Sequence, residues 1–127
     1  MNEEIFGKIC ELLEACLPKN WSEVFLFAGY SKDSYSMKYL FKTDSGILTD
    51  CFNLPAVTDD EIIKLFAKLN DILSKERSAL EGKNKWSVLK LTIKRDGAFN
   101  ADFDYTDHSE DMLSYEIEWE KAVRSDN

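Results

Sequence analysis

The stretch WSVLKLTIKRDGAFNADFDY, residues 86–105, alternates between apolar and polar side chains on both sides of a central Asp-Gly pair. A period of two residues is typical of strands that bury one face, and Asp-Gly is a common turn. The pattern therefore predicts a β-hairpin with one charged face. Its apolar face comprises Leu89, Leu91 and Ile93 before the turn, and Phe99, Ala101, Phe103 and Tyr105 after it.

The register of this hairpin follows from keeping the apolar side chains on one face. A three-residue loop at residues 96–98, with its glycine supplying the positive φ, sets Ile93 against Ala101. The same register places Lys90 opposite Asp104. A two-residue loop would mix the two faces, so the hydrophobic pattern argues against it.

Helical and strand patterns on either side of the hairpin supply the remaining elements. Apolar stripes at helical spacing predict a first and a last helix, and a capping box from Thr58 to Glu61 opens another between them. Aromatic and β-branched segments between the first two helices predict a three-stranded meander. The two terminal helices are expected in residues 2–18 and 109–123, and the meander in residues 21–30, 35–43 and 47–52.

These elements define one α+β domain spanning residues 1–127. Their order is α-β-β-β-α-β-β-α, and the short connections between strands are those of antiparallel pairs. We therefore expect a single antiparallel β-sheet of about five strands, with the helices packed largely on one face.

Composition and charge restrict the function further. The chain has three cysteines without metal-ligand spacing, so it predicts neither a disulfide framework nor a zinc site. No apolar run is long enough to span a bilayer, and the acidic N-terminus is unlike a secretory signal, which predicts a cytoplasmic protein that binds no membrane. A formal net charge of -8 argues against nucleic-acid binding, which depends on Lys and Arg.

The negative charge is concentrated near the C-terminus. Residues 99–120 hold eight of the 24 acidic residues and none of the 16 basic ones, so the rest of the chain is balanced. Such segregation concerns association more than folding. It predicts a surface for a cationic partner.

This acidic stretch also permits two more specific interpretations, a calcium site and a catalytic site. Asp102, Asp104 and Asp107 have carboxylate spacing reminiscent of a calcium loop, but the glycine and the closing glutamate of an EF-hand are missing. His108, the one histidine, could serve as a general base, yet no nucleophile motif accompanies it. A lone histidine among loop acids is most often a solvated turn residue, and this is the expectation for His108.

The last helix offers a feature of a different kind. Met112 and Trp119 belong to its inward stripe, whereas Leu113 and Ile117 form a second, narrower apolar ridge. Acidic residues border this ridge. An apolar ridge with an acidic rim is typical of a protein interface.

Two segments of the sequence resemble those of a known family. The segments EEIFGKICELLEACLPKNWSEVFLFA and WSVLKLTIKRDGAFNADFDYTD are similar to those of the YezG/EsaG-type immunity proteins, an antitoxin family. The resemblance gives Pro18 and Trp21 structural roles and makes Phe103, Asp104 and Tyr105 the end of the last strand. After Asp107 this chain departs from the family pattern, in which a Pro and an Arg commonly precede the final Trp.

The resemblance implies a small α+β protein, not an enzyme, that neutralises the nuclease domain of a secreted polymorphic toxin by binding it. The partner would be basic, the protein a monomer or weak dimer, and no catalytic, metal or cofactor residue is expected. A small metal-dependent hydrolase using Asp102, Asp104, Asp107 and His108, or an adaptor without a toxin, remains the alternative. The predicted partner-binding residues are Asp102, Asp104, Asp107, Glu110, Leu113, Glu116, Ile117 and Glu120.

Overall fold

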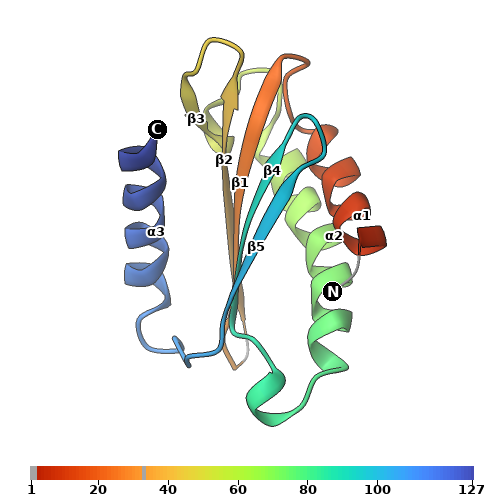
Figure 1. Ribbon diagram of the computed structural model, residues 1–127, viewed down its shortest axis with the longest axis vertical. Coiled ribbons are helices and arrows are strands. Elements are labelled where there is room, and N and C mark those ends of the chain that lie inside the picture. Colours follow the sequence, from red (N-terminus) through yellow and green to blue (C-terminus); the bar gives the residue numbers. More distant parts are fainter. Residues whose placement is uncertain (1–2, 33) are drawn as a thin grey trace.

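The computed structural model describes residues 3–32 and 34–127 and contains one five-stranded antiparallel sheet between two helical layers (Figure 1). The strand order is β3-β2-β1-β4-β5, with β1 in the centre. The predicted α+β class and the order α-β-β-β-α-β-β-α are confirmed. The elements are α1 (Glu3–Glu14), β1 (Trp21–Tyr30), β2 (Tyr35–Thr43), β3 (Leu48–Asp50), α2 (Asp59–Ser78), β4 (Val88–Lys94), β5 (Phe99–Asp104) and α3 (Met112–Asp126), with short 3-10 turns at Cys51–Asn53 and Gly82–Asn84.

The main core lies between the sheet and the pair α1 and α2, which cover one face (Figure 1). Ile9 and Leu13 of α1 and Leu69 and Leu73 of α2 are fully buried there. The expected capping box is present, because the Thr58 hydroxyl accepts a hydrogen bond from the Glu61 amide and the Glu61 carboxylate accepts one from the Thr58 amide. Two of the three helices thus share a face, as expected. None of the helices in the described residues is long and apolar enough to cross a membrane.

The third helix, α3, lies alone on the opposite face of the sheet (Figure 1). A second, smaller core forms beneath it, in which the Phe27 ring lies 5.4 Å from Trp119 and 6.0 Å from Tyr115, between ring centroids. Gly29 of β1 permits the close approach of Met112, because a Cβ at this position would lie 2.5 Å from the methionine sulfur. Both faces of β1 are therefore buried.

The hairpin of β4 and β5 has the expected apolar and charged faces but not the expected register. Ile93 pairs with Phe99 and Lys90 pairs with Asp102. The predicted register was therefore wrong by two residues along β5. A shift of two keeps every side chain on its face. The loop consists of residues 95–97, because Lys94 and Ala98 close it through a 2.8 Å hydrogen bond from the Lys94 amide. Gly97, with φ +94°, occupies the last loop position, where a three-residue hairpin loop needs the left-handed conformation.

Candidate partner-binding surface

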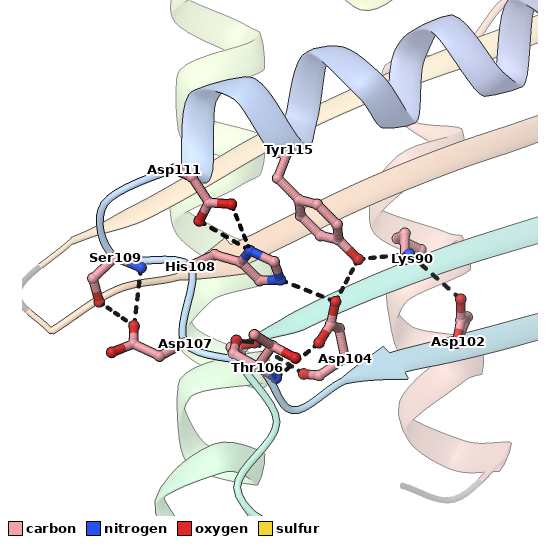
Figure 2. Close-up of polar contacts among 10 residues, drawn as sticks. Lys90, Asp102, Asp104, Thr106, Asp107, His108, Ser109, Asp111 and Tyr115 are labelled. Carbon is pink, nitrogen blue, oxygen red and sulfur yellow. Dashed lines mark hydrogen bonds and ion pairs between the residues drawn. The ribbon is translucent and has the colours of Figure 1, made fainter.

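The predicted site residues lie on β5, on the loop that follows it and on α3. Figure 2 shows Asp102, Asp104 and Asp107 among them. This segment returns the chain from the edge of the sheet to its second face. The structure divides the eight predicted residues into two groups. Asp104, Glu116 and Glu120 make internal contacts that hold α3 against the sheet, and the other five lie further out.

A polar cluster fastens the N-terminal end of α3. The Tyr115 hydroxyl donates a hydrogen bond to the Asp104 carboxylate and accepts one of 2.8 Å from the Lys90 ammonium (Figure 2). His108 bridges two carboxylates, with Nε2 3.0 Å from Asp104 and Nδ1 3.0 Å from Asp111. Its imidazole also stacks on the Tyr115 ring. Strand, loop and helix are thereby connected through one set of side chains.

The burial of His108 corrects the expectation of a solvated turn residue. Its two carboxylate partners and the Tyr115 ring provide a site for a buried cation. Burial alone would lower the pKa of His108, but the hydrogen bonds and charges of Asp104 and Asp111 outweigh this and raise it. Burial alone would raise the pKa of Asp104, yet hydrogen bonds from Tyr115, the Thr106 amide and His108 hold it well below its usual range. The arrangement therefore favours an imidazolium between carboxylates.

Further along α3, a second polar contact ties the helix to β2. The Lys38 ammonium lies 2.7 Å from the Glu120 carboxylate and 2.8 Å from that of Asp50. Burial would lower the pKa of Lys38, but these two partners raise it to about 12. Glu116 accepts a 3.0 Å hydrogen bond from the Ser36 hydroxyl. Glu116 and Glu120 are half-buried, so both serve to position α3.

The outward-facing members of the predicted set include an exposed apolar ridge on α3. Leu113 and Ile117 are 69% and 45% exposed, and Asp107 and Glu110 are exposed in the loop that precedes α3. Asp102 lies on the α3 face of β5, with its side chain 65% exposed and 3.5 Å from the Lys90 ammonium. The outer surface of α3 therefore combines the expected ridge with fewer free carboxylates than the sequence suggested.

Two further residues belong to this outer surface and were not among those predicted. Glu118 and Lys121 are exposed on α3, and Lys121 follows Ile117 by one helical turn. The 3.6-residue period could have identified both, because it separates the outer positions from the inward stripe. Lys121 makes the C-terminal end of the ridge less negative than its N-terminal end.

Each side chain of the Asp102, Asp104, Asp107 and His108 set contacts other groups of the protein. Asp104 and His108 bind each other, Asp107 accepts hydrogen bonds from the amide and hydroxyl of Ser109, and Asp102 lies near Lys90. Among the described residues, no group of three or more His, Cys, Asp or Glu side chains is arranged to hold a metal ion.

Comparison with known proteins defines the class. The family model for YezG-like immunity proteins matches residues 2–122, and the chain therefore belongs to this family. It is 25% identical over 122 residues to the immunity protein YezG of Bacillus subtilis (strain 168), covering 91% of this chain and 78% of that protein. It is also 25% identical over 123 residues to the protein of the same name from Bacillus spizizenii (strain ATCC 23059 / NRRL B-14472 / W23), covering 90% and 72%. The resemblance inferred from the sequence is confirmed.

Proposed function

We propose that this immunity protein neutralises a secreted toxin by binding the toxin's nuclease domain in a stoichiometric complex. The observation that carries the proposal is the apolar ridge of Leu113 and Ile117 on the outer surface of α3, with Asp107 and Glu110 at its N-terminal end. Large exposed apolar side chains with a polar rim are typical of a protein interface. The protein would act in the cytoplasm as a binding protein, without catalysis or a cofactor.

Charge complementarity favours a nuclease as the target. A nuclease attracts polyanions and needs a cationic cleft, whereas this chain has a formal charge of -8. Exposed carboxylates accelerate the encounter with a cationic surface, and they compete with the phosphates of the substrate. Desolvated Leu113 and Ile117 would then prolong the life of the complex.

The internal contacts of α3 prepare this surface for binding. Lys38 and Glu120 fix one end of the helix, and Tyr115 with Asp104 fixes the other. An interface that is already ordered loses less conformational entropy when a partner binds. The inward-facing acids of the predicted set would therefore support binding by positioning the ridge.

Copurification tests the proposal. The protein would be expressed with a tagged, catalytically disabled nuclease domain of its cognate toxin, and the purified complex would be analysed by light scattering. We expect a complex with one copy of each chain, and a free protein that is monomeric or weakly dimeric. Elution of the tagged domain alone would contradict the proposal and favour the adaptor alternative.

A further inference from the structure

Strand β5 is an edge strand whose outer backbone groups lie open. It is the last strand in the sheet, and in the described part of the chain no strand pairs with its outer side. The bond from the Lys94 amide to the Ala98 carbonyl sets the alternation, so Asn100 and Asp102 direct their backbone groups toward β4. The N–H and C=O groups of Phe99, Ala101 and Phe103 consequently point away from the sheet.

The side chains on the α1 and α2 face of this edge are apolar, whereas edge strands usually carry protective charges. Phe99 is 42% exposed, and Tyr105, which follows the strand on the same face, is 57% exposed. A groove of about 440 Å³ lies between α1 and the Phe99 end of β5. A second groove of about 310 Å³ lies beside Phe103 and Tyr105 at the other end. Helices α1 and α2 thus cover their face of the sheet only partly at the edge strand β5.

Carboxylates border these grooves. Glu3, Glu11 and Glu14 of α1 line the first groove, and Glu76 of α2 lines the second. Among the described residues that line either groove, none is a Lys or an Arg. Asp102 adds an exposed carboxylate on the opposite face of the same strand. An occupant of this edge would therefore be favoured if it carried positive charge.

We propose that the edge of β5 binds an extended basic segment of the toxin as a sixth strand of the sheet. The inference rests on the proposed function, because the nuclease domain supplies the segment. Backbone hydrogen bonds to Phe99, Ala101 and Phe103 would hold it, its apolar side chains would cover the exposed aromatic rings, and its Lys or Arg side chains would reach the glutamates of α1. Since β5 leads directly into the loop that carries Asp107, this edge and the α3 ridge can form one interface.

A proline at residue 101 tests the backbone contact. Ala101→Pro removes an outward N–H and is compatible with an edge strand, whereas Ala101→Val keeps the N–H and serves as the matched control. Binding of each variant to the disabled nuclease domain would be measured by calorimetry, after a thermal melt. We expect Ala101→Pro to weaken binding by about tenfold or more and Ala101→Val to bind as the wild type does.

A second variant keeps the test decisive if the proline disturbs the fold. Glu11→Lys with Glu14→Lys changes only exposed side chains on α1, and we expect weaker binding that recovers partly as salt is added. If the wild type binds and every folded variant binds equally well, the edge-strand inference is overturned while the proposed function stands. If the wild type itself fails to bind the nuclease domain, both are overturned.

Discussion

The imidazole of His108 lies parallel to the ring of Tyr115, with centroids 3.9 Å apart and planes inclined by 12°. Both side chains also contact the Asp104 carboxylate at the end of β5. This cluster joins the loop after β5 to α3, the helix that lies by itself on the second face of the sheet. Its integrity should therefore contribute to how firmly α3 is held.

The Tyr115 hydroxyl should contribute measurably to stability. Tyr115→Phe leaves Asp104 and Lys90 without their shared partner in a half-buried site, so we expect a loss of about 1–3 kcal/mol in the free energy of unfolding. The exposed Tyr105 provides a control, because Tyr105→Phe removes a hydroxyl that faces solvent. Urea titrations followed by fluorescence would compare the two. Equal losses would mean that the cluster does not stabilise α3.

Stability should depend on pH through His108. Its pKa is raised from 6.5 in the folded chain, so the folded state binds the proton more tightly than the unfolded state. The stabilisation is complete below about pH 6.5 and is lost as the pH rises through the folded-state pKa. We expect the stability advantage of the wild type over His108→Gln to shrink over this interval. The comparison needs urea titrations of both proteins between pH 5.5 and 9, and a constant advantage would contradict the assignment.

The main core should tolerate truncation far less than the surface of the same helix. Leu69 of α2 is fully buried, whereas Ile63 is largely exposed. We expect Leu69→Ala to cost about 2–5 kcal/mol in unfolding free energy, and Ile63→Ala less than about 1 kcal/mol. Thermal and urea denaturation of both variants would check this difference. Similar losses for the two variants would mean that α2 does not pack on the sheet through the face that carries Leu69.

The two parts of the proposed interface should affect different rate constants. Asp107→Asn with Glu110→Gln should slow association and reduce its dependence on salt, because exposed charges act at a distance. Leu113→Ser with Ile117→Ser should accelerate dissociation, because buried anchors are lost from the complex. Surface plasmon resonance at two salt concentrations would separate the rates.

Controls for these rate measurements come from the other side of the molecule. Asp60→Asn with Asp71→Asn removes the same number of charges from exposed positions of α2, and should leave both rate constants nearly unchanged. Circular dichroism would first establish that all variants are folded. Unaltered rates in both interface variants would mean that the toxin binds a different surface of the protein.

The sequence predicted the elements and their order because these depend on local periodicity and capping. The position of α3 on its own face was not anticipated, although β1 gave a signal. Phe25 and Phe27 are buried on one side and Val24 and Leu26 on the other, and such a nearly continuous apolar strand indicates burial of both faces.

The hairpin register and the inward acids were harder to predict. The register depends on which loop position takes the positive φ of Gly97, and composition alone does not determine this. The contact between Lys38 and Glu120 joins residues far apart in the sequence, so charge counting could not show that Glu120 is engaged within the protein. The outward ridge was predictable because helical spacing determines it.

Inhibition of the nuclease is the most direct test of the central claim. A fixed amount of the active nuclease domain would be titrated with this protein, and cleavage of its nucleic-acid substrate would be measured at each ratio. If the protein neutralises the toxin by stoichiometric binding, cleavage falls in proportion to the added protein and ends at about one molar equivalent. Undiminished cleavage at a several-fold excess of folded protein would contradict the proposed function.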